Sequence, residues 1–450
     1  MTMRMSTIAG TLALVFLATT ARAQAPAPPA FGGCGGISPT KPTITPTYST
    51  TGADRTNLGF ECMAWQNFIY LNWPAQPGQR GVPNASAKFG AAGPTVWETY
   101  KTSEQTFLPD AVDPGPWNGS QLMTVLGDRL AGQVAAGQVR NLVMTSKISR
   151  PVLANVARHI AVNGTPLNNI IQAGGGTLYD LKGNPVYYEV SMNQDQYGYI
   201  VKNGFYDANK QIAFAASKVI SLPVGTTIYG TMGALELKAA WKVLSATEIT
   251  SGRFHTTQAL LPGSPLPVTV GLAGFHMFMS GFGGQGVWAT FAQVDNAPVQ
   301  GGPVKGPYNF YNPGCTGCPV NVEDANPGQV LQITPDEAST PPLNSYMQAL
   351  IKTYDPSTPW QYYKIVNIQW PLQPKDIATL PAPANVPLPD GSPNSQTVVN
   401  AVLETFLQYP NTGCLACHTG ATVAPSGTSA PNYASSYSFM FGHAKVPKKK

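Results

Sequence analysis

The chain has 450 residues, enough for one large domain or two ordinary ones, and a formal net charge of +5. Charged residues make up only 11%, whereas Gly and Pro number 45 and 42. This composition argues against a helical bundle, and the absence of a basic field argues against nucleic-acid binding. We expect an exported, turn-rich protein with an α+β fold that is mainly β, with helices at the periphery.

The first 23 residues have the features of a secretory signal peptide. Arg4 supplies a positive start, residues 8–17 form a short apolar run, and small residues precede the expected cleavage point. The apolar run is too short to span a bilayer, and no later stretch is apolar enough to do so. We therefore predict a periplasmic or secreted protein without a transmembrane anchor. An extended Pro/Gly-rich arm is expected over 24–56.

Residues 57–371 are predicted to form a β-rich main domain. Apolar side chains at helical spacing predict a helix over 60–73, which Pro74 would end. Further helices are expected over 121–130 and 343–354. From 178 to 251 the hydrophobic period changes to two. Strands are predicted over 178–181 and 186–190 as a hairpin, and over 226–237, 267–279, 287–294 and 363–370.

A Pro-rich segment over 372–393 is expected to be a stiff, extended connector. The C-terminal segment, 394–450, follows it. An amphipathic helix is predicted over 395–408, because apolar residues recur on one helical face. The members of that face are Val398, Val402, Leu403, Phe406 and Leu407.

Shortly after this predicted helix stands a C-x-x-C-H motif made of Cys414, Cys417 and His418. Two thiols at this spacing can bond to the two vinyl groups of one haem, and the adjacent His then binds iron as the proximal ligand. The alternatives are a surface disulfide or a pair of zinc ligands. Bacteria attach haem covalently outside the cytoplasm, so the predicted signal peptide favours one covalent haem c.

The segment that carries this motif is short. Only 32 residues follow His418. A complete small cytochrome must bury most of an apolar macrocycle, and roughly 50 residues provide little core for that purpose. We therefore expect the C-terminal segment to dock on the β-rich body. The alternative is a free-standing small cytochrome tethered by the Pro-rich connector.

The second axial ligand of the iron has several candidates. His276 lies within an otherwise apolar predicted strand, where an imidazole needs a hydrogen bond or a metal. Met440 and His443 follow the proximal His by little more than 20 residues. His159 and His255 stand among polar residues, and we expect both at the surface.

Four cysteines remain outside the haem motif, and an even number in an oxidising compartment predicts two disulfides. The expected pairs are Cys34–Cys62 and Cys315–Cys318. Pro319 stands where a second haem motif would need His, so Cys315 and Cys318 do not form one. A redox-active dithiol is the alternative there, although no helix pattern follows that would lower a thiol pKa.

Several blocks of the chain together resemble one large, poorly characterised bacterial family. The blocks are 61–68, 97–101, 236–241, 271–276 and 287–298. They are similar to blocks of cytochrome c family proteins with a single C-terminal C-x-x-C-H haem box. The resemblance covers about 57–443 and includes a Ser-Phe pair like Ser438-Phe439.

The resemblance implies a distal role for His276, since a His usually stands at that position in the family. It implies no known reaction. Residues 281–286 depart from the family pattern.

We expect an exported monohaem cytochrome that transfers electrons to an unidentified redox partner. Two other classes remain open. One is a haem enzyme, a peroxidase or oxygenase, with an open iron position. The other is a module whose β-rich body binds a polymer or partner and uses the haem as a relay. Glu236 and Lys238 alternate with leucines, so they are predicted on the solvated face of a strand.

Overall fold

The computed structural model describes residues 34, 37–43, 56–119, 133–134, 137–145, 176–225, 232–264, 266–333, 340–425 and 431–448. The predicted signal peptide, the predicted helix over 121–130 and His159 lie outside these ranges. The described residues form an α+β fold that is mainly β, as the composition predicts. No helix in these ranges is long and apolar enough to cross a membrane.

The centre of the fold is an eight-stranded mixed sheet. The long strand β6 pairs with β4, β5 and β7, and all neighbours are antiparallel except the parallel pair β2 and β5. The strands are β1 Lys101–Thr102, β2 Val139–Asn141, β3 Tyr187–Met192, β4 Leu235–Val243, β5 Thr256–Leu260, β6 Val268–Met279, β7 Val287–Gln293 and β8 Tyr363–Gln369.

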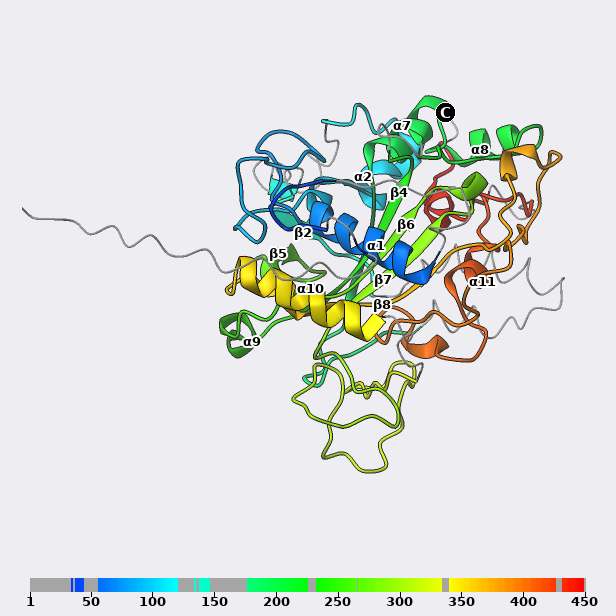
Figure 1. Ribbon diagram of the computed structural model, residues 1–450. Coiled ribbons are helices and arrows are strands. Elements are labelled where there is room, and N and C mark those ends of the chain that lie inside the picture. Colours follow the sequence, from blue (N-terminus) through cyan, green and yellow to red (C-terminus); the bar gives the residue numbers. More distant parts are fainter. Residues whose placement is uncertain are drawn as a thin grey trace, which may run out of the picture.

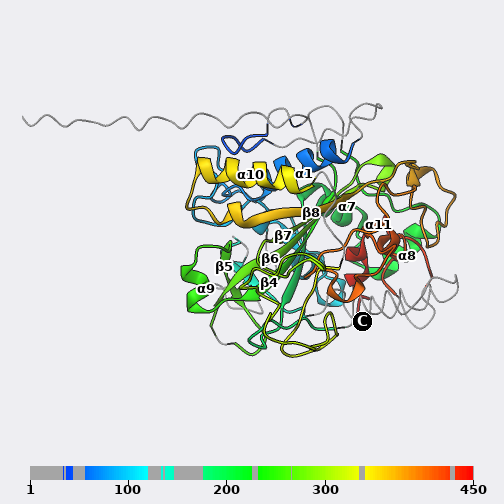
Figure 2. The ribbon, with the colours of Figure 1, turned by 60° about the horizontal axis from the view of Figure 1, so that its bottom comes forward.

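Two long helices, α1 (Asn57–Leu71) and α10 (Thr340–Tyr354), cover one side of the sheet, here called the first face (Figures 1 and 2). Thr56 begins α1 by accepting a hydrogen bond from the Gly59 N–H at 3.0 Å, as an N-cap does. Beneath α1, the ring of Phe68 stacks on Phe291 of β7 at 4.4 Å. This packing forms the main apolar core.

The opposite side of the sheet, the second face, is also covered. Because side chains alternate along a strand, Leu237 of β4 points to the first face and Lys238 to the second. A second apolar cluster joins the strands to α7, α8 and the C-terminal segment. The other α-helices of the described residues are α2 Ser103–Thr106, α7 Gln194–Asn203, α8 Ala208–Ala215, α9 Ala246–Thr250 and α11 Cys414–His418.

Several predicted elements with strong apolar periodicity are confirmed. They include α1, α10 and the antiparallel pair β6–β7. The tight turn near Gly183 is present, with its N–H donating to the Asp180 carbonyl at 3.0 Å. Of the strand predicted over 226–237, residues 226–231 lie outside the described ranges, and β4 begins at Leu235. Helices α7, α8 and α9 were not expected, because the stretch from 178 to 251 has a hydrophobic period of two.

The prediction of an amphipathic helix over 395–408 is wrong. Only the 3₁₀ turn Thr405–Leu407 forms there. The Asn400 side chain accepts the Val402 N–H at 3.0 Å, and the Asn400 N–H donates to the Glu404 carboxylate at 2.8 Å. Such local side-chain bonds compete with the helical ladder. The predicted apolar face is nevertheless buried against the sheet.

The Pro-rich segment over 372–393 is also not an extended connector. Its ends pair with each other: Leu372 N–H donates to the Ser392 carbonyl at 2.9 Å, and Gln373 N–H to the Gly391 carbonyl at 2.8 Å. The segment is therefore a closed loop. Proline has no backbone N–H, but Leu372 and Gln373 do, and their N–H groups form the bonds that close it.

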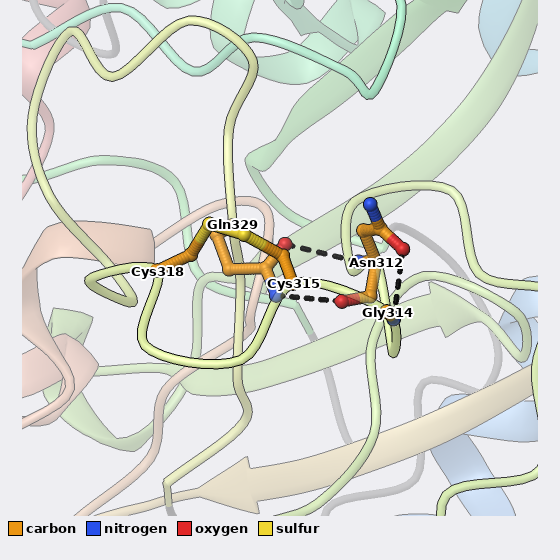
Figure 3. The surroundings of a disulfide bond; sticks show 5 residues. All are labelled: Asn312, Gly314, Cys315, Cys318 and Gln329. Atoms are coloured by element: carbon orange, nitrogen blue, oxygen red, sulfur yellow. Dashed lines mark hydrogen bonds between the residues drawn. A yellow bond between two sulfur atoms is a disulfide. The ribbon is translucent and has the colours of Figure 1, made fainter.

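Both predicted disulfides are present. Cys34–Cys62 ties the N-terminal arm to α1. Cys315–Cys318 lies in the irregular loop that projects from the body over 299–332 (Figure 1). Next to it, the Gln329 amide accepts from the Asn312 N–H at 2.9 Å and donates to the Asn312 carbonyl at 3.1 Å (Figure 3).

The two disulfides are expected to differ in their contribution to stability. Replacing both Cys34 and Cys62 by Ser should lower the free energy of unfolding by about 3.5 kcal/mol, and the same change at Cys315 and Cys318 by about 2 kcal/mol, because loop-closure entropy grows with loop length. Urea denaturation would measure both.

Nonreducing peptide mapping should find no free thiol at these four positions. A free Cys315 of depressed pKa would instead support the redox-active dithiol.

Candidate functional site

A pocket lies between the second face of the sheet and the C-terminal segment. Counting the solvent in its open mouth, the pocket has a volume of about 980 Å³. Most of its walls are apolar. Every residue predicted for the haem site lines this one pocket: Cys414, Cys417, His418, His276, Met440 and His443.

The C-x-x-C-H motif forms the short helix α11, which the sheet holds in place. Gln369 at the end of β8 accepts the Leu415 N–H at 2.7 Å and donates to the Ser395 carbonyl at 2.6 Å. A side chain at position 413 would clash, since a Cβ there would lie 2.4 Å from the Gln369 amide nitrogen. Gly413 therefore permits this close approach.

Cys414 and Cys417 carry free thiols that line the pocket. Burial raises the pKa of Cys417 to about 12, and it raises the pKa of Cys414 well above its ordinary value. Both groups are therefore protonated at neutral pH. The predicted alternative of a disulfide within the motif is wrong in this structure.

The His418 ring lies between two aromatic rings, with centroids 4.3 Å from Trp288 and 4.8 Å from Phe439. Its Nδ1 lies 2.6 Å from the Tyr437 carbonyl oxygen. A carbonyl can only accept, so Nδ1 carries the proton and Nε2 keeps its lone pair. Burial lowers the pKa of His418 to about 3, so the imidazole is neutral at pH 7.

His276 lies on the second face of β6, directly opposite Lys238 of β4 and Thr290 of β7. Its side chain is 20% exposed, and its Nε2 makes no hydrogen bond to the described residues. The nearest carboxylate oxygen is that of Glu404, at 3.3 Å. His276 lines the pocket, with this carboxylate beside its Nε2.

Met440 and His443 lie on the 3₁₀ turn Phe439–His443. Met440 is buried in the apolar cluster beneath the C-terminal segment. The ring of His443 stacks on Phe107 at 6.2 Å, and burial lowers its pKa to about 4. Both side chains reach the pocket wall, so the structure keeps them as alternatives to His276.

The prediction that Glu236 and Lys238 lie on a solvated strand face is wrong. Both side chains line the pocket. Burial raises the pKa of Glu236 and lowers the pKa of Lys238. The predicted alternation holds, but the C-terminal segment covers the face to which they point. That cover comes from residues about 200 positions away, and no local pattern signals it.

His255 is likewise not at the surface. It is buried on the first face, where its ring stacks on Trp360 at 4.5 Å and its Nε2 lies 3.2 Å from Glu98 Oε1. It belongs to a different part of the molecule from the pocket. The aromatic and acidic partners come from distant segments, so its polar sequence neighbours did not predict burial.

These residues fit a covalently bound haem. Two free thiols, a neutral His with its Nδ1 satisfied, and a His276 Nε2 that makes no hydrogen bond to the described residues all lie at one mainly apolar pocket. Within the described ranges, no group of three or more His, Cys, Asp or Glu side chains is arranged to hold a bare metal ion. Comparisons with protein-family models, curated proteins and solved structures found no match.

Proposed function

We propose that this protein is an exported monohaem c-type cytochrome that transfers electrons. The observation that carries the proposal is the convergence of Cys414, Cys417, His418 and His276 on one apolar pocket. The first three are contiguous in sequence, whereas His276 comes from the central strand of the sheet. The sequence resemblance to cytochrome c family proteins points the same way.

Each residue has a distinct role in this proposal. Cys414 and Cys417 would hold the haem through thioether bonds to its two vinyl groups. His418 would bind the iron through Nε2 while the Tyr437 carbonyl holds its Nδ1–H, and His276 would supply the second protein ligand. The bound haem supplies one-electron Fe(III)/Fe(II) chemistry. Two imidazole ligands lower the reduction potential relative to a His/Met pair.

One contact favours a second candidate, a haem enzyme with an open iron position. Glu404 Oε2 lies 3.3 Å from the same His276 nitrogen that would bind iron. If His276 keeps this contact with Glu404 and does not bind iron, the two groups form an acid–base pair inside the pocket. Such a pair can move a proton to or from a small substrate. The carbon monoxide experiment discussed below separates these two candidates.

Covalent attachment is the first test. Expressed in a bacterium that matures c-type cytochromes, the secreted protein should be heavier than its chain by one haem and should stay coloured after acid–acetone extraction. Intact-mass spectrometry would measure this. A Cys414→Ala/Cys417→Ala variant should lose the haem, because thioether bonds can no longer form.

The matched control is Cys315→Ala/Cys318→Ala, which removes the same number of sulfur atoms outside the pocket and should keep the haem. Wild-type protein that releases its haem on extraction, or whose mass lacks it, would exclude the proposed function.

A further inference from the structure

The carbonyl that holds His418 belongs to an unusual turn. Ser436 and Tyr437 both adopt left-handed backbone angles, with φ of 56° and 60°. Residues other than Gly rarely do so, and such backbone persists only where its surroundings fix it. The turn directs the Tyr437 carbonyl at His418 Nδ1, 2.6 Å away. The strained backbone therefore serves a defined contact within the proposed haem site.

Several bonds fix the turn. The Tyr437 hydroxyl donates to the Pro389 carbonyl at 2.5 Å, and the Leu222 N–H donates to Ser436 Oγ at 3.0 Å. Within the turn, Ser435 Oγ donates to the Ser438 carbonyl at 2.8 Å. The loop over 372–393 and the chain before β4 thus both hold it in place.

The sheet supplies one further anchor, the carboxyl group of Glu236. Ser438 Oγ donates to the carboxylate of Glu236 on β4 and accepts the Met440 N–H at 3.2 Å. The Gln196 amide at the start of α7 donates to the same Glu236 oxygen at 2.9 Å. Glu236 thereby links the rigid centre of the fold to the residue that follows Tyr437.

We infer that Glu236 and Ser438 are positioning residues for the proximal His418. They hold the Tyr437 carbonyl where it accepts the Nδ1 proton, which orients the ring and makes Nε2 a stronger donor to iron. A stronger imidazole donor favours Fe(III), so this anchor keeps the reduction potential low. The inference rests on the proposed haem function, and it assigns roles to two residues that touch neither iron nor the thioether sulfurs.

The reduction potential of purified holoprotein variants tests this role. Ser438→Ala removes the anchor without changing charge. It should shift the Fe(II)/Fe(III) ratio about tenfold towards Fe(II), a rise of 59 mV for one electron. Ser191→Ala is the matched control, because Ser191 is a buried serine whose hydroxyl makes no hydrogen bond to the described residues. It should leave the potential unchanged.

Two changes at Glu236 separate the hydrogen bond from the charge. Glu236→Gln and Glu236→Leu remove the same charge, but only Gln retains an oxygen that can accept from Ser438. The potential of the Leu variant should exceed that of the Gln variant by about the Ser438→Ala shift.

Ser438→Ala protein that keeps its haem and loses thermal stability at an unchanged potential would overturn the positioning role alone. Equal potentials for the Gln and Leu variants would overturn it as well. A wild-type mass without haem would instead exclude the proposed function on which it rests.

Discussion

Arg140→Met is expected to lower the free energy of unfolding by about 3–5 kcal/mol, because it leaves a buried carboxylate without its partner. Arg140 on β2 donates to both carboxylate oxygens of Glu189 on β3, with Nε 2.8 Å from Oε2. The two side chains are only 3% and 2% exposed. Arg140 also donates to the Glu98 carbonyl. Burial lowers the pKa of Arg140 to about 10, so it remains charged at neutral pH.

This ion pair belongs to a larger buried group on the first face. Burial opposes the ionisation of Glu98, but His255 and Arg140 outweigh that effect and hold its pKa below the ordinary value. The Thr95 N–H also donates to Glu98 Oε2 at 2.7 Å. Loss of Arg140 therefore removes a stabilising positive charge from the carboxylates of both Glu189 and Glu98.

Arg253→Met is the matched control. Arg253 makes a similar two-bond pair with Asp295, at 2.7 and 2.8 Å, but the side chains are 37% and 29% exposed. Its loss should cost about 1 kcal/mol or less, because water screens exposed pairs. Urea denaturation followed by circular dichroism would measure both.

An Arg140→Met/Glu189→Leu double variant should recover part of the stability, since the buried Glu189 carboxylate that Arg140 paired is removed as well. Equal losses for Arg140→Met and Arg253→Met would contradict the expected cost of burial.

The buried ion group shows where prediction from sequence ends. Glu98, Arg140, Glu189 and His255 come from four separate segments, and no period or motif relates them. His255 was expected at the surface because Thr256 and Thr257 follow it. Burial of a polar side chain is decided by its neighbours in space, which a single sequence does not reveal.

Elements with strong local signals were predicted well. Apolar residues at spacings of three and four identified α1, and the long apolar runs of β6 and β7 identified the central pair. The segment 395–408 had an equally clear helical pattern, yet it is irregular. There the side chain of Asn400 takes over backbone hydrogen bonds, and the apolar residues are buried without a helix.

The candidate site divides in the same way. The C-x-x-C-H motif is contiguous, so its chemistry can be recognised without a fold. His276 could be singled out because an imidazole in an apolar strand needs a partner. Glu236 and Lys238 could not, because their exposure depends on the distant C-terminal segment. The expected docking of that segment on the body rested on its small size, and the structure shows its described residues over 398–425 and 431–443 packed against the second face.

His276→Ala is expected to open the iron of the proposed haem. If His276 Nε2 and His418 Nε2 are the two axial ligands, the wild-type reduced protein is low-spin and does not bind carbon monoxide. The variant should become high-spin when reduced and bind carbon monoxide stoichiometrically, because an Ala side chain cannot ligate iron. Absorption spectra of the reduced protein, with and without carbon monoxide, would measure this change.

Met440→Ala and His443→Ala are the matched controls, since both residues line the same pocket. Each should leave the spectrum nearly unchanged. A spectrum that changes only in Met440→Ala would show that the C-terminal segment supplies both ligands, and the role of His276 would be excluded. Wild-type protein that already binds carbon monoxide would favour the enzyme, with His276 held by Glu404 at 3.3 Å. Electron transfer needs no vacant position on iron, whereas a peroxidase or oxygenase does, so this one spectrum separates the two functions.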